Sequence, residues 1–180
     1  MYEVSEDSYL LRNTLRDEPL QSGTAIEVGV GSGVITVVLA EQLDTVIGVD
    51  IDGEAVSYCK DKFSDNPSVT IKHSDMFDAV GDVEASVITA NPPYLPSTAG
   101  DNSDDALDGG ETGIEYTVRF LDAAASYLAD DGRIYFVASD KADLNGLHDF
   151  LDASQYEWRR LRDTRYFFET LYVYRAQALD

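Results

Sequence analysis

The segment between residues 24 and 33 reads Thr24-Ala25-Ile26-Glu27-Val28-Gly29-Val30-Gly31-Ser32-Gly33. Its first half is a short, mostly apolar run typical of a buried strand, and its second half has glycine at every other position. Apolar residues then recur at helical spacing, at Ile35, Val38, Leu39 and Leu43. A strand that enters a helix through a glycine-rich turn indicates an α/β fold, with the turn at the carboxyl edge of the sheet.

The same alternation of strand and helix continues along the chain. Further strands are predicted at residues 45–50, 68–73, 85–90 and 133–137, followed by two antiparallel strands at 157–162 and 169–175. Helices are predicted at residues 5–17, 53–63, 113–128 and 142–151, and a turn at Asp131-Gly132. The 180 residues show no repeat or linker, so we predict one domain over residues 1–180. We expect a Rossmann-like α/β fold, a mostly parallel sheet with helices on both faces.

Composition narrows the range of functions. Hydrophobic residues make up 44% of the chain, but no apolar run reaches the ~18 residues that a membrane span needs. The first residues are acidic and polar, unlike a signal peptide, so we expect a cytoplasmic protein without membrane contact. Cys59 is the only cysteine, and His73 and His148 stand apart from other ligand residues. We therefore expect no internal disulfide and no bound metal ion.

The chain is strongly acidic along its whole length. It has 34 aspartates and glutamates against 13 lysines and arginines, a net charge of −21. Such a surface resembles those of proteins adapted to high cytoplasmic salt, where self-repulsion is screened within ~3 Å at molar ionic strength. It also argues against a nucleic-acid substrate, because phosphate binding needs clustered lysine and arginine.

The glycine-rich turn predicts a nucleoside site. Glycine at 29, 31 and 33 leaves free amide groups at a helix start and lets a ligand approach the backbone. A dinucleotide fingerprint would place glycine at position 34, which is Val34 here. With Glu27 before the turn, a cationic cofactor without a pyrophosphate fits better, which favours S-adenosylmethionine. The alternative is a purely structural turn between strand and helix.

Two carboxylates support the nucleoside prediction. Asp50 ends the second strand, where its carboxylate can accept hydrogen bonds from both ribose hydroxyls. Asp75 follows the third strand, where it can accept one from the adenine amine.

The segment Asn91-Pro92-Pro93-Tyr94 follows the fourth strand and predicts the reaction. A planar amide or exocyclic amine nitrogen is a poor nucleophile and needs orientation more than deprotonation. The Asn91 side-chain oxygen and the Pro92 carbonyl can each accept one N–H of such a nitrogen. Pro92 and Pro93 make the backbone rigid, and Tyr94 provides a flat wall for the target group. The alternative is a proline turn that ends the strand.

Four further stretches make the resemblance specific. They are Tyr2-Glu3-Val4-Ser5-Glu6-Asp7-Ser8, the glycine-rich turn, Ala106-Leu107-Asp108-Gly109-Gly110, and Glu169-Thr170-Leu171-Tyr172-Val173. With the Asn-Pro-Pro-Tyr segment, they resemble the HemK-type protein glutamine methyltransferases. The resemblance covers nearly the whole chain and points to the archaeal and eukaryotic branch, which methylates the glutamine of the Gly-Gly-Gln motif in class I peptide release factors.

The resemblance implies a seven-stranded sheet with a reversed last strand, in a class I methyltransferase. It implies that the N-terminal helix covers the site, with Glu3, Asp7 and Ser8 over the cofactor and target amide. It also implies a small zinc-binding activator subunit. We expect that subunit to add a strand beside Val69 to Ile71, on an edge strand of the sheet. The chain departs from the family at Val4, where proline is usual.

These observations define the expected site. The predicted catalytic residues are Asn91, Pro92, Pro93 and Tyr94. The predicted cofactor-binding residues are Asp7, Ser8, Glu27, Gly29, Gly31, Gly33, Asp50, Ile51, Asp75, Met76 and Asn91. The predicted substrate-binding residues are Glu3, Asp7, Asn91 and Tyr94.

Two other functions stay open at this stage. Enzymes that methylate adenine or cytosine amino groups in nucleic acids use a similar Asn-Pro-Pro-aromatic segment. A non-catalytic scaffold could also retain the fold, although the intact glycines and Asn91 count against it. The cluster of Arg159, Arg160, Arg162 and Arg165 could dock an acidic substrate or form a salt-bridged strand surface.

Overall fold

The computed structural model describes residues 6–96 and 109–179. Its strands are β1 Thr24–Val28, β2 Thr45–Asp50, β3 Val69–His73, β4 Ala85–Ala90, β5 Leu128–Ser139, β6 Tyr156–Arg165 and β7 Thr170–Ala178. Its α-helices are α1 Glu6–Asp17, α2 Val34–Gln42, α3 Gly53–Lys62, α4 Glu115–Ala124 and α5 Leu144–Ala153. No described helix is long and apolar enough to cross a membrane.

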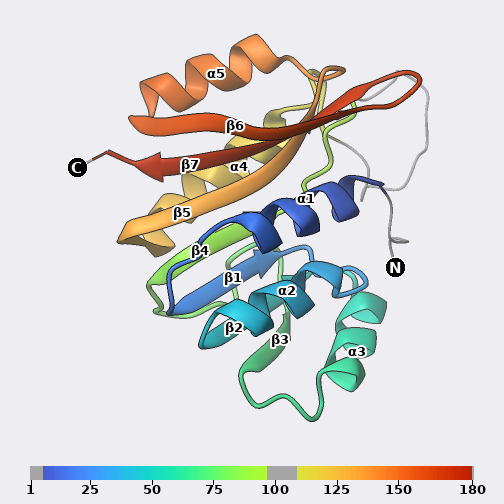
Figure 1. Ribbon diagram of the computed structural model, residues 1–180, viewed down its shortest axis with the longest axis vertical. Helices are drawn as coiled ribbons and strands as arrows, with labels where there is room; N and C mark the ends of the chain where they lie inside the picture. Colours follow the sequence, from blue (N-terminus) through green and yellow to red (C-terminus); the bar gives the residue numbers. More distant parts are fainter. Residues whose placement is uncertain (1–5, 97–108, 180) are drawn as a thin grey trace.

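The strands form one seven-stranded sheet in the order β3-β2-β1-β4-β5-β7-β6 (Figure 1). Strands β1 to β5 pair in parallel, whereas β7 is antiparallel to both β5 and β6. The predicted seven-stranded sheet with a reversed last strand is therefore confirmed. The strand order changes direction between β1 and β4, and ligands of α/β sheets bind at the carboxyl ends of the strands at such a point.

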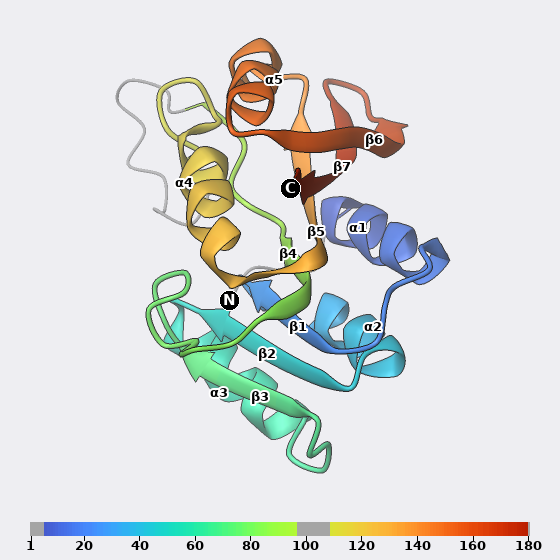
Figure 2. The same cartoon turned by 90° about the vertical axis from the view of Figure 1, so that its left-hand side faces the viewer.

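Helices cover both faces of the sheet, as predicted (Figure 2). Helices α1 and α2 pack on one face over a cluster that includes Leu11, Leu39 and Val173, all without solvent exposure. Helices α4 and α5 pack on the other face over the larger cluster, with Phe120 and Leu147 also fully buried. The central strands are buried on both faces, which explains their nearly continuous apolar sequences.

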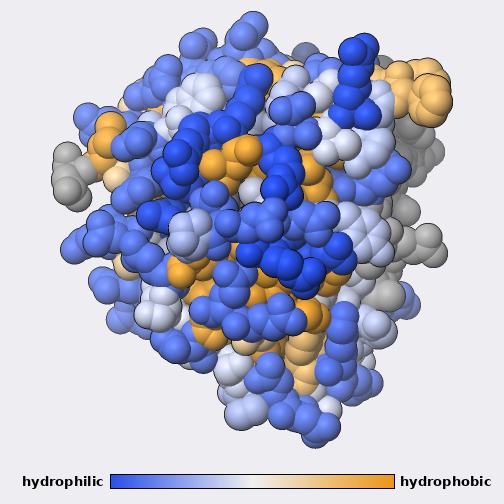
Figure 3. Space-filling view, in the orientation of Figure 1, coloured by the Kyte–Doolittle hydropathy of each residue, from blue (hydrophilic) through white to orange (hydrophobic). Residues whose placement is uncertain are grey.

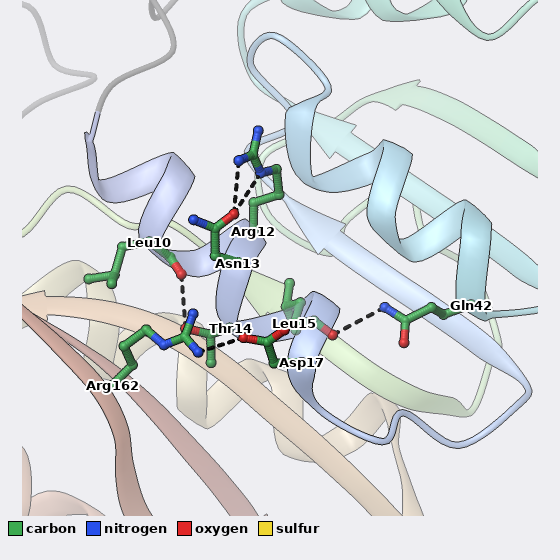
Figure 4. A network of polar contacts seen from close by, with 8 residues as sticks. All are labelled: Leu10, Arg12, Asn13, Thr14, Leu15, Asp17, Gln42 and Arg162. Atoms are coloured by element: carbon green, nitrogen blue, oxygen red, sulfur yellow. Dashed lines mark hydrogen bonds and ion pairs between the residues drawn. The ribbon is translucent and has the colours of Figure 1, made fainter.

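Helix α1 is fastened to the sheet at its carboxyl end (Figure 4). Asp17 accepts a hydrogen bond from Arg162 of β6 at 2.6 Å, and Gln42 of α2 donates to the Leu15 carbonyl at 3.1 Å. Leu11 and Leu15 are fully buried beneath the helix. These contacts fix α1 so that its first turn, with Asp7 and Ser8, lies against the carboxyl edge of the sheet.

Two predicted boundaries were wrong. The turn predicted at Asp131-Gly132 lies inside β5, which begins at Leu128. Gly132 approaches the Ala85 carbonyl so closely that an added Cβ would lie 2.7 Å from its oxygen, and the β4–β5 register shifts between Ala85 and Val87. An irregular strand pairing therefore produces the turn-like sequence. The helix predicted to reach residue 128 ends at Ala124, and Ala125–Tyr127 form a 3-10 turn.

Candidate active site

A cavity of about 580 Å³ opens at the carboxyl edge of the sheet. It is lined by the segments that follow β1, β2, β3 and β4, by the first turn of α1 and by α4. Its volume falls within the ~300–1,000 Å³ of small-molecule sites in proteins. The sheet therefore places a ligand-sized cavity at the position that its topology predicts.

The glycine-rich turn after β1 lines this cavity. Gly29 and Gly31 have positive φ angles of 82° and 47°, which other residues rarely adopt. The Gly31 amide donates to one Asp50 carboxylate oxygen at 2.9 Å, and the Asp52 amide donates to the other at 2.9 Å. Each carboxylate oxygen has a second lone pair, so Asp50 can hold the turn and still accept ribose hydroxyls.

Gly33 serves a different purpose from the other two glycines. It is not among the cavity-lining residues, and a Cβ at this position would lie 2.8 Å from the Phe63 ring and 3.0 Å from the Cys59 sulfur. Its φ of 71° also favours glycine. The structure thus places Gly33 in close packing with Cys59 of α3 and with Phe63 after it, outside the residues that line the cavity, and its predicted cofactor contact stays a prediction.

Glu27 lies at the bottom of the cavity with 2% exposure, on β1. Thr36 donates a short hydrogen bond to its carboxylate. Burial raises the pKa of Glu27 to about 8, because the desolvation outweighs the hydrogen bond from Thr36. The carboxyl group is therefore mostly neutral at pH 7 in the free protein, and a bound cation would favour its ionised form.

The far end of the cavity carries the segments after β2 and β3. Ile51 is 65% exposed and lines the opening, as do Asp75 and Met76. Asp75 forms an ion pair with Arg119 at 3.5 Å. Burial, and secondarily the charge of Asp75, raises the pKa of Tyr116. An aromatic ring, an aliphatic side chain and a carboxylate acceptor thus line the same cavity, which are the groups that a nucleobase site needs.

The Asn-Pro-Pro-Tyr segment lines the cavity after β4, the strand next to β1. The Asn91 amide nitrogen donates to Ser8 at 3.5 Å, whereas Asn91 Oδ1 is buried without a hydrogen-bond partner among the described residues. The Tyr94 hydroxyl donates to Asp7 at 3.0 Å, and Pro92 is buried. A buried acceptor without a partner is unfavourable unless a ligand supplies the donor, so Asn91 Oδ1 is available for a substrate N–H.

A second backbone segment packs against the Asn-Pro-Pro-Tyr segment. Gly109 donates its amide to the Leu95 carbonyl at 3.0 Å, and a Cβ at Gly109 would lie 3.0 Å from the Pro93 carbonyl oxygen. The stretch Ala106 to Gly110 is one of the sequence segments that resemble the HemK-type family. Its last two residues support the catalytic segment, and the first three lie outside the described residues.

The structure brings nearly all predicted site residues to this cavity. They are Asp7, Ser8, Glu27, Gly29, Gly31, Asp50, Ile51, Asp75, Met76, Asn91, Pro92, Pro93 and Tyr94. Glu3 lies outside the described residues. Leu11, Thr89, Tyr116 and Arg119 also line the cavity and were not predicted from the sequence. For Thr89 a signal existed, since it precedes Asn91 by two residues and so faces the same side.

These residues fit a cationic nucleoside better than a phosphate-rich one. The cavity offers acceptors, namely the carboxylates of Glu27, Asp50 and Asp75 and the orphaned oxygens of Asn91 and Thr89. Among the residues that the structure describes, no group of histidine, cysteine and carboxylates could hold a metal ion.

Comparison with known proteins assigns the fold and site to a family. The pattern of the family described as Methyltransferase small domain matches residues 2–167. A Methanocaldococcus jannaschii protein that carries the name protein N5-glutamine methyltransferase is 34% identical over 145 residues, 77% of this chain and 72% of that protein. A Geobacter sulfurreducens release factor glutamine methyltransferase is 30% identical over 135 residues, covering 68% of this chain and 47% of that enzyme.

Solved structures agree with this assignment. The methyltransferase from the E. cuniculi Mtq2–Trm112 complex, responsible for methylation of the eRF1 translation termination factor, has a TM-score of 0.80 and 25% identity, covering 99% of this chain and 98% of that chain. A T. thermophilus 16S rRNA N2 G1207 methyltransferase, solved with AdoMet and guanosine, has a TM-score of 0.73 at 21% identity, covering 98% of this chain and 44% of that chain. The second likeness shows the fold alone.

Fold, cavity and comparisons together define an S-adenosylmethionine-dependent methyltransferase. The chain belongs to the methyltransferase small domain family, within the HemK-type protein N5-glutamine methyltransferases.

Proposed function

We propose that the enzyme transfers a methyl group to the side-chain amide nitrogen of the glutamine in the Gly-Gly-Gln motif of a class I peptide release factor. One observation carries this proposal above the others. Asn91 Oδ1 is a buried acceptor with no donor among the described residues, at the end of β4 and at the wall of the cavity. A primary amide of the substrate supplies the missing N–H.

The residues of the chain orient this amide. Asn91 Oδ1 accepts one N–H, and the Pro92 carbonyl is the predicted acceptor of the other. The lone pair of an amide nitrogen is delocalised, so two acceptors stabilise the nitrogen as it becomes tetrahedral and more acidic. Positioning of this kind contributes up to ~7–11 kcal/mol to lowering a barrier. When bound, S-adenosylmethionine supplies an electrophilic methyl group.

Helix α1 keeps the catalytic segment in place. The Asp7 carboxylate accepts a hydrogen bond from the Tyr94 hydroxyl at 3.0 Å. The Ser8 hydroxyl accepts one from the Asn91 amide nitrogen at 3.5 Å. The second contact fixes which end of the Asn91 amide faces the cavity, because the nitrogen turned toward Ser8 leaves Oδ1 on the other side. We propose that Asp7 and Tyr94 together form the wall against which the target side chain packs.

The cofactor roles follow from the same geometry. Asp50 is the proposed acceptor for the ribose hydroxyls, and Asp75 for the adenine amine. Ile51 and Tyr116 flank the proposed base position. Glu27 lies at the bottom of the cavity, where its carboxylate would attract the positively charged amino group and sulfonium of the cofactor.

Methyl transfer from labelled cofactor tests the proposal. A purified release factor and its variant with alanine at the motif glutamine are the two substrates, at molar potassium chloride. We expect label in the first and none in the second. Label in both proteins, or in RNA added instead of protein, would overturn the substrate assignment in favour of another site or of a nucleic-acid amino group.

We further infer a small activator subunit at the β3 edge. Supporting this proposal, β3 is the terminal strand of the sheet and the E. cuniculi relative was solved as a complex with Trm112. The Ser68 carbonyl accepts a hydrogen bond from the Val46 amide, and the Ser74 amide donates to the Asp50 carbonyl. The backbone amides and carbonyls of the even-numbered residues of this segment therefore face β2. The amide and carbonyl of Ile71 therefore point outward, toward an added strand. Zinc in this subunit is part of the proposal.

A further inference from the structure

The β6–β7 hairpin ends in a turn that carries two exposed aromatic side chains. Phe167 is 100% exposed and Phe168 is 86% exposed, whereas Tyr166 and Glu169 beside them are partly buried. The space-filling view shows an apolar patch at the corner where the hairpin ends, at the upper right (Figure 3). Two phenyl rings in water are unfavourable, and a surface that retains them marks an interaction site.

Hydrogen bonds join the two ends of the turn to each other and to β5. The Tyr166 amide donates to the Glu169 carbonyl at 2.8 Å, and the Ser139 hydroxyl donates to the Glu169 carboxylate at 2.9 Å. The Tyr166 ring packs against the same apolar cluster as Tyr94 of the catalytic segment. The backbone that carries the aromatic pair is thus held in place before a partner binds, which lowers the cost of ordering the turn.

The turn lies on the same edge of the sheet as the active site. Strand β6 is antiparallel to β7, which is antiparallel to β5, so the carboxyl ends of β5 and β6 lie together. Glu6 and Asp7 of α1 are among the charges that raise the pKa of Tyr166, after burial. Between β4 and β6 lie three strand spacings of ~4.8 Å, so β6 lies roughly 14 Å from the catalytic strand across the sheet, and the hairpin tip extends from its carboxyl end.

We propose that Phe167 and Phe168 dock the protein that presents the target glutamine, by burying in an apolar patch of that protein. This inference rests on the proposed function. An extended chain advances ~3.3 Å per residue, so at least about four residues separate the target from a contact at the tip. The tip therefore contacts the substrate outside the methylated motif. A folded protein that reaches the tip should bind more tightly than a short peptide that carries only the motif.

Charge favours a protein partner over a nucleic acid. The chain carries a net charge of −21, which repels a phosphate backbone. On β6, Arg162 is paired with Asp17 at 2.6 Å and Arg160 donates to the Tyr174 hydroxyl at 2.8 Å, whereas Arg165 beside the turn is exposed. An apolar contact works in the presence of this charge because it needs no opposite charge on the partner, and salt does not screen it.

The double variant Phe167→Ser/Phe168→Ser tests the proposal in steady-state methylation of a release factor. Burial of two phenyl rings predicts a rise in KM of roughly ten- to a hundredfold, with kcat within about twofold of wild type. Calorimetry should give an unchanged cofactor Kd, which shows that the fold and cavity are intact. Leu179→Ser is the matched control, since Leu179 is 56% exposed at the opposite end of the same hairpin.

Each outcome bears on one of the two proposals. If wild-type enzyme methylates the release factor and the double variant has the same KM, the docking surface is wrong and the proposed function stands. A variant that instead loses the activator subunit or changes its oligomeric state assigns the patch to another occupant and overturns the inference. If wild-type enzyme transfers methyl groups only to RNA, both proposals are wrong.

Discussion

At the scale of single residues, Asn91 carries the catalytic claim. Asn91→Ala removes the orphaned acceptor Oδ1, whose contact with the substrate matters most in the transition state. We expect kcat to fall by about 10²-fold or more, the usual effect of removing one stabilising group from a reaction centre. The cofactor Kd from calorimetry should stay within about twofold of wild type. Near wild-type turnover in this variant would be incompatible with the assignment.

Glu27 makes cofactor binding dependent on pH. Its pKa in the free protein is about 8, and a cationic ligand binds the ionised form better. As pH falls from about 8 toward 6, the carboxyl group is protonated, so the Kd should rise by up to about tenfold per pH unit. Glu27→Gln should bind more weakly at high pH and lose this dependence. An equally steep pH profile in that variant would locate the titrating group elsewhere.

The same carboxyl group affects folding with a defined sign. Its pKa is raised from 4.5 to about 8 on folding, so the folded state binds more protons than the unfolded state between these values. The unliganded protein is stabilised by this group below pH 4.5 and loses that contribution as pH rises through 8. The melting temperature of Glu27→Gln minus that of wild type should therefore be higher at pH 8.5 than at pH 5. A constant difference between the two proteins would contradict the raised pKa.

Most of the site residues that could be predicted lie in or directly after a strand of the sheet. Asn91 to Tyr94 are consecutive and follow a strand, so strand position and chemistry together identify them. Tyr116 and Arg119 come from α4, and their approach to Asp75 depends on how that helix packs across the sheet. Nothing local in the sequence encodes that approach.

At the scale of elements, the edge strand β3 is the proposed docking point for the activator. Hydrogen exchange at Val69 to Ile71 should slow when the subunit is added, because the outward amide of Ile71 gains a partner. Strand β6 is the other edge of the sheet and serves as the internal control, with exchange expected to stay unchanged. Protection that appears on β6 and not on β3 would move the interface to the opposite edge.

Element types were predictable because apolar periodicity encodes burial. The strand at residues 85–90 and the helix at residues 53–63 match β4 and α3 to within one residue. The prediction failed at the start of β5, where Gly132 accommodates the Ala85 carbonyl. A glycine needed for close strand packing and a glycine in a turn look alike in sequence. The aromatic turn at Phe167 likewise gave no local signal of its place beside the active site.

At the scale of the whole molecule, charge is expected to control stability. Four ion pairs are seen in the described part of the chain, whereas the net charge is −21. The remaining acidic groups repel one another, and this repulsion is screened within ~3 Å at molar salt. We expect the melting temperature to be clearly higher in 2 M than in 0.1 M potassium chloride. Equal melting temperatures would count against adaptation to high salt.

Above all, we propose that this protein methylates a glutamine amide in another protein. The most direct measurement is mass spectrometry of a release factor after incubation with the enzyme, S-adenosylmethionine and the activator subunit at molar salt. We predict one added methyl group, on the side-chain nitrogen of the glutamine in the Gly-Gly-Gln motif, with wild-type enzyme and not with Asn91→Ala. An unmodified motif glutamine under conditions where wild-type enzyme binds its cofactor would contradict the account.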